Sequence, residues 1–310
     1  MMSLRPGDIF GPYTLERPLS DDGGMSQVLL AYDTERTQYK AALKVQLSQN
    51  DNSAAFQDLL RSEAQILQTL RHPGIVRIYP LRIDNRVIYT ARAAMQMERP
   101  WYFAMEYIPG ASLDQYLKPI SRFPLSWTIE LFYQILVTVD FIHSTGYAHC
   151  DIKPQNIMFR QEPQRQQTPT PILIDFGSAT QIKRGVQQLA ASIRYSPPEV
   201  ILALDRKDIP ARALLTHPQK IDIWALGAIL FEVVTGRPLI NQQRKEEITT
   251  TILQGHLDEM RTHRPEIHKS LDTLLHKMLH RQPTERPDTK TIIKAIEEHI
   301  HSIRPPRIGG

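Results

Sequence analysis

The sequence predicts an α+β protein with two structural parts, a strand-rich first part and a mainly helical second part. Its 310 residues amount to roughly two domains of about 150 residues, or to one fold with two lobes. Alternation of apolar and polar residues over 27–33 and 41–46 indicates strands. Residues 112–303 follow mostly helical periodicity. A composition of 41% hydrophobic and 23% charged residues is typical of a soluble globular protein and excludes the disordered, collagenous and membrane classes.

One predicted strand and one predicted helix of the first part each carry a charged residue at a position that is expected to be at least partly buried. The strand over 41–46 places Ala42 and Lys44 on the same face of a half-buried sheet. Residues 55–71 are predicted to form an amphipathic helix whose apolar stripe includes Glu63. Because an unpaired buried charge is costly, we expect this carboxylate to have a cationic partner.

The second part begins after a natural hinge. Residues 101–108 read as a strand that ends at Pro109-Gly110. Three long helices are predicted beyond it, over 126–144, 221–235 and 289–303. The segment 221–235 is apolar almost all round, so we expect it to be the buried axis of the second part.

Charge and cysteine content narrow the partners and the compartment. The net charge is +4 without a run of like charge, so we predict no nucleic-acid partner. A single cysteine, Cys150, excludes an intramolecular disulfide and a multi-thiolate zinc site, which suits the cytoplasm. The start of the chain lacks an apolar signal segment, and charges such as Glu130, Asp140 and Glu232 interrupt the longest apolar stretches. We therefore expect no membrane segment.

The most informative stretch for chemistry is Tyr147-Ala-His-Cys-Asp-Ile-Lys-Pro-Gln-Asn156, followed by an apolar run that ends in Asp175-Phe-Gly177. It places a carboxylate, a lysine and an asparagine on one loop, and a second carboxylate at the end of a buried strand. These are the parts that a phosphoryl-transfer site needs: a proton acceptor, a cation for the phosphate and oxygen ligands for magnesium. An Asp-Phe-Gly triplet alone is common by chance, but its order after H-x-D-x-K-P-x-N is not.

With these motifs the sequence resembles the eukaryotic-like (Hanks-type) serine/threonine protein kinases, over about residues 13–303, and the resemblance points to a bacterial member. The motifs that carry it are, in order, Ala41-Ala-Leu-Lys44, Glu63 in RSEAQIL, His149 to Asn156, Asp175-Phe-Gly177, Ser196-Pro-Pro-Glu199, Asp222 to Gly227, and Arg286 in PTERP.

The resemblance implies a bilobal protein-kinase fold, with a small antiparallel β-sheet lobe that contains one helix and a larger, mainly helical lobe. The boundaries it implies are a lead-in over 1–12, an N-lobe over 13–105, a hinge over 106–111, a C-lobe over 112–303 and a flexible tail over 304–310.

The resemblance also implies roles for individual residues. Lys44, paired with Glu63, would position the α- and β-phosphates of ATP. Asp151 would accept the proton of the substrate hydroxyl, and Lys153 would neutralise charge on the γ-phosphoryl group. Asn156 and Asp175 would hold Mg²⁺, with Mn²⁺ as the alternative metal.

The adenine site implied by the resemblance has Met105 as its gatekeeper and the backbone of Glu106 and Ile108 beside the base. Further residues would line it, namely Leu19, Gly23, Gly24, Val28, Ala42 and Met158. Lys153 together with Ser192 is similar to the serine/threonine pattern, so we expect the substrate to be a protein with a Ser or Thr acceptor, the chain itself included.

Two departures from the family pattern bear on activity. The glycine-rich loop is reduced to Gly23 and Gly24, beside the acidic Asp21. This favours a pseudokinase or nucleotide-binding scaffold as the main alternative; a kinase for small molecules is the third possibility. Cys150 stands where many of these kinases have an arginine that repels other cations until the activation segment is phosphorylated. We therefore predict activity that does not depend on such phosphorylation.

Three stretches are insertions relative to the family pattern: 84–99, 161–171 and 202–219. Loops of this length commonly serve recognition or regulation.

Overall fold

The computed structural model describes residues 4–20, 26–47, 53–83, 86–96, 99–118, 123–161, 170–186, 192–205 and 215–303. Most of the predicted insertion 161–171, half of 202–219, four residues of 84–99, the glycine-rich residues 21–25 and the tail lie outside these residues. The chain divides into two compact units, Met1–Pro109 and Gly110–Gly310. The α+β class predicted from the sequence is confirmed, because the first unit is built on an antiparallel sheet and the second is mainly helical.

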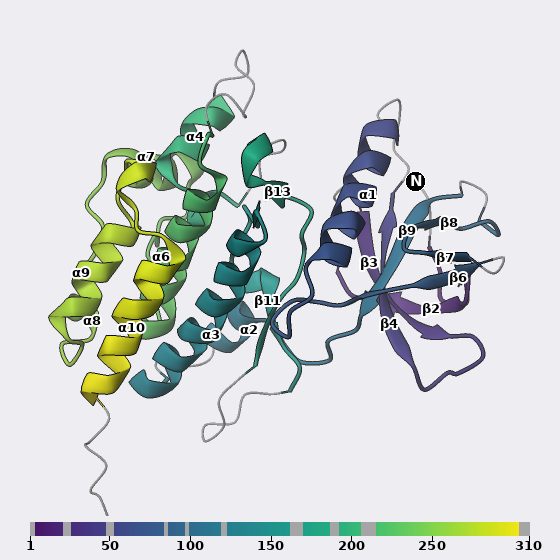
Figure 1. The fold of residues 1–310 in the computed structure, drawn as a ribbon, viewed down its shortest axis with the longest axis horizontal. Helices are drawn as coiled ribbons and strands as arrows, with labels where there is room; N and C mark the ends of the chain where they lie inside the picture. The colour runs from purple at the N-terminus through teal and green to yellow at the C-terminus, as the bar shows by residue number, and fades with distance from the viewer. Residues whose placement is uncertain are drawn as a thin grey trace, which may run out of the picture. The chain divides into compact units, whose positions relative to one another are not determined.

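The first unit consists of one antiparallel sheet, a small hairpin and one described helix (Figure 1). The main sheet has the strand order β1-β2-β3-β4-β9-β5, and β8 also pairs with β9. Its strands are β1 (Ile9–Phe10), β2 (Tyr13–Pro18), β3 (Ser26–Asp33), β4 (Lys40–Gln46), β5 (Ile78–Tyr79), β8 (Ala91–Arg92) and β9 (Trp101–Glu106). The hairpin pairs β6 (Leu81–Ile83) with β7 (Arg86–Ile88). The helix is α1 (Ser53–Thr69).

Helix α1 and strand β9 both end earlier than the sequence pattern predicts. The helix ends at Thr69 rather than at 71, because a proline at 73 disfavours helical backbone in the residue before it. The strand ends at Glu106 rather than at 108, because Pro109 has no N–H to continue a ladder.

The core of the first unit lies on one face of its sheet. Leu29, Leu43, Val45, Tyr102 and Ala104 belong to one buried cluster, and none of them is more than 2% exposed. Successive residues of a strand face opposite sides, so the residues between them lie on the other face. That second face carries several of the predicted site residues.

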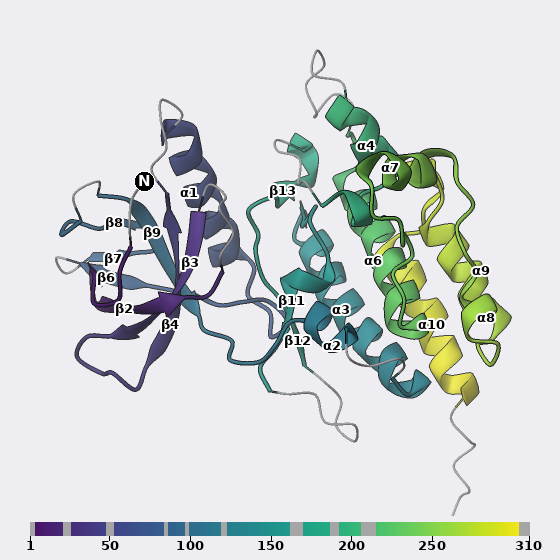
Figure 2. The ribbon, with the colours of Figure 1, turned by 180° about the vertical axis from the view of Figure 1, so that it is seen from behind.

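The second unit is a bundle of helices with two short strand pairs (Figure 2). The described helices are α2 (Leu113–Leu117), α3 (Leu125–Ser144), α4 (Pro198–Asp205), α6 (Pro218–Thr235), α7 (Lys245–Gln254), α8 (Met260–His263), α9 (Lys269–Met278) and α10 (Thr289–Ile303). Strand β10 (Tyr147–Ala148) pairs with β13 (Thr180–Gln181), and β11 (Ile157–Phe159) pairs with β12 (Pro171–Leu173).

Helix α6 is the buried axis of this unit, as its all-round apolar pattern predicts. Its residues from Ile221 to Leu230 are all buried, and it packs against α3 and α9. At Gly227 an added Cβ would lie 2.9 Å from Leu279 Cδ2, so glycine permits this close approach. The helix begins at Pro218, three residues before the predicted start, because proline is favoured in the first helical turn.

Among the described helices, only Leu125–Ser144 is long and apolar enough to cross a membrane by length and composition. This is α3, and 56% of its apolar window is buried inside the protein. Such burial is what a core helix of a globular unit also shows.

A buried ion pair ties α4 to the segment between α9 and α10. Arg286 Nη1 and Nη2 donate to the two carboxylate oxygens of Glu199 at 2.7 and 2.8 Å. The Arg286 side chain is 0% exposed and also donates to the carbonyl oxygens of His280 and Lys220. Every part of the guanidinium that leaves water is thereby hydrogen-bonded, as a buried cation requires.

Replacing this arginine should strongly destabilise the second unit. Arg286→Ala leaves Glu199 and the three carbonyl groups of His280, Lys220 and Arg281 without their donor, and we expect a loss of about 3–5 kcal/mol in the free energy of unfolding. Urea unfolding followed by circular dichroism measures the loss. Arg244→Ala, at a side chain that is 80% exposed, is the control and should change stability by less than about 0.5 kcal/mol. Equal effects of the two variants would contradict this account.

Candidate active site

Lys44 on β4 and Glu63 on α1 form a nearly buried ion pair in the first unit. The Lys44 Nζ donates to Oε1 and Oε2 of Glu63 at 2.8 and 2.7 Å. The two side chains are 12% and 4% exposed. The carboxylate in the apolar stripe thus has the cationic partner that its position demands. The pair fixes the lysine ammonium on one face of the sheet.

The register of the sheet brings further predicted site residues to the same face. Val28 lies opposite Lys44, and Ala42 lies opposite Met105. Since Ala42 and Lys44 are two residues apart on β4, all four share a face. Leu19 lies beside them, because its N–H donates to the carbonyl of Val28 at 2.8 Å.

Four other residues of the first unit are predicted to belong to the nucleotide site. Glu106 ends β9, and its N–H donates to the carbonyl of Arg77 at 2.8 Å. Ile108 is buried just beyond that strand. Gly23 and Gly24 lie outside the described residues.

In the second unit, Asp151, Lys153 and Asn156 form one hydrogen-bonded network. Lys153 Nζ donates to Asp151 Oδ2 at 2.8 Å and to Ser192 Oγ at 2.8 Å. Asn156 Nδ2 donates to the same Asp151 Oδ2 at 3.1 Å and to the Asp151 carbonyl at 2.9 Å. One carboxylate is therefore held from two sides, and the lysine connects it to a hydroxyl from a distant part of the chain.

Asp222 of α6 holds the loop that carries this network, through hydrogen bonds to the backbone of the loop. Asp222 is 0% exposed. Its carboxylate accepts the backbone N–H groups of His149 and Cys150 at 2.9 and 2.7 Å, and it contacts His143 Nε2 at 2.9 Å. The sequence motif included Asp222, but reasoning from the sequence assigned no role to it or to His143. The signal that could have found this anchor is the position of Asp222 among the apolar residues of the helix, where a carboxylate needs donors, as for Glu63.

The His149 ring is buried inside the loop and connects its two ends. The Asp151 N–H donates to His149 Nδ1 at 3.3 Å, and His149 Nε2 lies 3.2 Å from the carbonyl of Ile174. These partners assign the proton to Nε2, which donates to the carbonyl. The ring also contacts Phe176, with centroids 4.6 Å apart. The His149 side chain thus couples the Asp151 loop to the Asp175-Phe-Gly turn.

Cys150 and Asp175 both have left-handed backbone conformations, with φ of 61° and 59°. Such conformations are uncommon for residues other than glycine and cost of order 1 kcal/mol. Asp175 follows β12, and the Gly177 N–H lies 3.4 Å from its Oδ1. Met158 lies on β11, opposite Ile172 of β12. Met158 thus lies on one strand of this pair, and Asp175 lies two residues beyond the end of the other.

The Cys150 side chain packs into an apolar cluster instead of facing solvent. Its neighbours in that cluster include Val186, Val200, Leu215 and Ile221. Burial, with smaller contributions from the nearby carboxylates of the loop and of α6, raises the pKa of the Cys150 thiol well above its ordinary value. The thiol is therefore protonated at neutral pH and behaves as a small apolar group.

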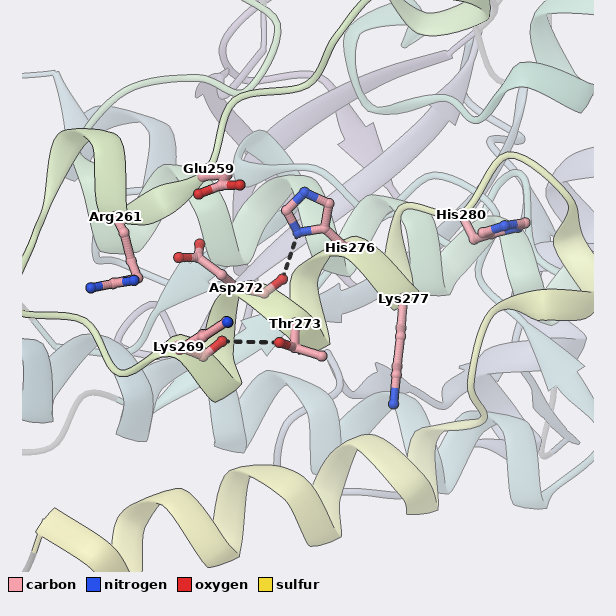
Figure 3. Close-up of a pocket in the computed structure, with 8 residues that line it drawn as sticks. All are labelled: Glu259, Arg261, Lys269, Asp272, Thr273, His276, Lys277 and His280. Carbon is pink, nitrogen blue, oxygen red and sulfur yellow. Dashed lines mark hydrogen bonds between the residues drawn. The ribbon is translucent and has the colours of Figure 1, made fainter.

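His276 on α9 and His280, two residues beyond the end of that helix, are four residues apart, a spacing at which two imidazoles on one helix can share a metal ion. Figure 3 shows the two imidazoles well apart, and both belong to residues that line one surface cavity. His276 Nδ1 lies 2.8 Å from the carbonyl of Asp272, within the helix, and His280 Nδ1 lies 3.3 Å from that of Gln282. In the described part of the chain, no group of three His, Cys, Asp or Glu side chains is arranged to hold a metal ion.

The raised pKa of Cys150 predicts a thiol that reacts slowly with disulfide reagents. At pH 8 a free thiol of ordinary pKa is partly ionised, but this one stays protonated because its folded-state pKa is higher. Titration of the folded protein with a chromogenic disulfide should therefore show almost no reaction, and unfolding in urea should release one equivalent, since the chain has a single cysteine. Rapid reaction in the folded state would contradict the burial.

Comparison with known proteins assigns the family. A family model described as the protein kinase domain matches residues 20–296. The chain is 27% identical over 290 residues to the serine/threonine-protein kinase PknH of Mycobacterium bovis, covering 91% of this chain and 43% of that protein. It is 28% identical over 307 residues to PknD of Chlamydia pneumoniae, covering 90% and 30%. It is 29% identical over 290 residues to PknB of Mycobacterium leprae, covering 92% and 42%. The chain spans less than half the length of these relatives. It belongs to the protein kinase domain family.

Proposed function

We propose that this protein transfers the γ-phosphoryl group of Mg-ATP to Ser or Thr hydroxyls of protein substrates, itself included. The observation that carries the proposal is the Asp151–Lys153–Asn156 network, in which one carboxylate is fixed by two donors and a third residue, Ser192, holds the lysine. The relatives named serine/threonine-protein kinases support Ser or Thr as the acceptor. Use of ATP and a divalent cation is general for kinase domains.

The chemistry that we assign to the loop follows from its charges. The Asp151 carboxylate is 10% exposed and accepts the proton of the substrate hydroxyl as the oxygen attacks. The Lys153 ammonium, 2.8 Å from that carboxylate, offsets negative charge on the phosphoryl group during transfer. Asn156 keeps the carboxylate oriented, so the base does not have to reorganise during the reaction.

Asn156 and Asp175 fit a divalent cation. Asn156 donates through Nδ2 to Asp151, and its Oδ1 accepts no hydrogen bond from the described residues. An amide oxygen and a carboxylate are the hard ligands that Mg²⁺ prefers, and Mn²⁺ accepts them too. The cation, when bound, neutralises charge on the β- and γ-phosphates.

The first unit supplies the residues that we assign to the nucleotide. The Lys44 ammonium, held by Glu63, contacts the α- and β-phosphates. We assign the adenine to the face of the sheet that carries Lys44 and to the residues that follow β9, and we include Met158 from the second unit and the two glycines. The full set is Leu19, Gly23, Gly24, Val28, Ala42, Met105, Glu106, Ile108 and Met158. As lobes, we assign 13–105 and 112–303, with the hinge over 106–111.

Apolar packing supports activity without phosphorylation of the activation segment. Val186, in that segment, packs in the same apolar cluster as Cys150. Because Cys150 carries no positive charge, no phosphate is needed to neutralise a cation at this position. The C-terminal part of the segment is also held, because Tyr195 OH donates to Glu232 at 2.7 Å and Arg194 donates to the carbonyls of Ile240 and Gln242. These contacts need no modified residue.

We further propose that the protein acts in the cytoplasm on protein substrates, without a nucleic-acid partner or a membrane segment in this chain. The single buried cysteine and the unremarkable net charge support this assignment.

Loss of the proposed base is the first test. Asp151→Asn should reduce transfer of labelled γ-phosphate to Ser or Thr of a generic basic protein by about 10²–10⁴-fold, the usual contribution of a positioned base. Asp258→Asn, at an exposed carboxylate, is the matched control and should retain activity. If the wild type transfers nothing but gains thermal stability with Mg-ATP, the chain is instead a nucleotide-binding pseudokinase.

Removal of phosphate from the protein tests the second part of the proposal. After treatment with a phosphatase and removal of that enzyme, the initial rate on a protein substrate should equal that of the untreated sample, because apolar contacts hold the segment. Mass spectrometry confirms the absence of phosphate at the start. A lag that disappears as the protein autophosphorylates would show that the segment needs modification.

A further inference from the structure

Two arginines converge on one tryptophan at the surface of the first unit. Trp101 opens β9 and lies opposite Arg92 of β8, so both side chains are on the same face of the sheet. Arg61 reaches the same ring from α1. The guanidinium carbons of Arg61 and Arg92 lie 4.0 and 5.3 Å from the centre of the indole ring. Both arginines are exposed to solvent.

Within the part of the chain that the structure describes, no carboxylate forms an ion pair with either of these two cations. Among the described residues, neither Arg61 nor Arg92 forms an ion pair or a hydrogen bond through its side chain, and the buried Trp101 Nε1 has no acceptor. The indole ring attracts each guanidinium through its π face, but two like charges on one ring still repel each other. The described residues thus provide three side chains with donor groups at this ring and no acceptor for them.

The sequence on either side of Arg92 is rich in positive charge, and it includes one exposed apolar side chain. From 64 to 105 the described residues include six arginines and no Asp or Glu; Asp84 and Glu98 lie outside the described residues. The turn between β8 and β9 carries Met95, which is 73% exposed, and Arg99, whose φ is 43°. An exposed methionine in the turn that follows Arg92 provides an adaptable contact for the residues that flank an anion.

We propose that Arg61 and Arg92 bind the phosphoryl group of a phosphorylated Ser or Thr in a polypeptide segment. Two planar guanidinium groups match a phosphoryl group, which carries a charge of about −1.5 to −2 and three acceptor oxygens. A carboxylate carries only one charge and would leave one of the two cations unbalanced. Met95 would contact the residues next to the modified one. The supply of such segments rests on the proposed function, since phosphorylated polypeptides are its product; the binding step does not.

A fluorescence titration without nucleotide tests binding separately from catalysis. The chain has three tryptophans; Trp127 and Trp224 are buried, whereas Trp101 is partly exposed at the site. The probe is a synthetic peptide of small neutral residues with one phosphothreonine and no aromatic residue. Saturable change in tryptophan emission is expected with this peptide. Equal change with the unphosphorylated peptide, or affinity no better than that of inorganic phosphate, overturns the proposal.

Substitutions then identify the residues that bind the phosphopeptide. Arg61→Gln and Arg92→Gln should each weaken binding of the phosphopeptide about tenfold, as expected for loss of a charged hydrogen-bonding group. Arg82→Gln is the matched control, because Arg82 is an exposed arginine of the same unit on β6. Trp101→Phe should abolish the change in emission. Urea midpoints verify that the variants are folded.

The variants also separate this inference from the proposed function. Binding that is unchanged in both arginine variants, or weakened equally by Arg82→Gln, overturns the site. Loss of kinase activity in every preparation, with intact binding of the phosphopeptide, would leave the site supported and refute only the proposed function.

Discussion

The buried carboxylate of Asp222 is the interaction on which the geometry of the second unit depends. An aspartate removed from water inside an apolar helix is costly unless donors surround it. Here the donors are the backbone of His149 and Cys150 and the ring of His143. Stabilising the charge therefore also fixes the path of the loop. The strained, left-handed backbone at Cys150 is held in place by the same contacts.

The first unit also contains a buried carboxylate that needs a partner, here on a helix that packs against the sheet. Glu63 is buried on α1 and Lys44 on β4, and neither could be left in place without the other. In each unit, a charge that cannot remain unpaired determines where the functional side chains lie. The surrounding apolar core supplies rigidity, because close-packed residues such as those of α6 allow little displacement.

Long elements and motif residues could be predicted from the sequence, because periodicity and the apolar environment of Glu63 are local signals. The α+β class, the buried α6 and the inward carboxylate all follow from such signals. The start of α6 at Pro218 was missed, since it lies in a stretch of weak periodicity. The anchoring by Asp222 and the stacking of two arginines on Trp101 depend on contacts between distant segments, and periodicity carries no information about them. The roles of the site residues follow from the family resemblance and stay predictions.

The burial of Cys150 has a practical consequence for spectroscopy. Because the only native sulfhydryl is enclosed by aliphatic side chains, the natural polypeptide can be handled much like a cysteine-free background. A cysteine introduced at a surface position of either unit would then be the one accessible attachment point for a spin label or a fluorophore. Pairs of such labels, one in each unit, would report the distance between the units in solution without any further engineering of the chain.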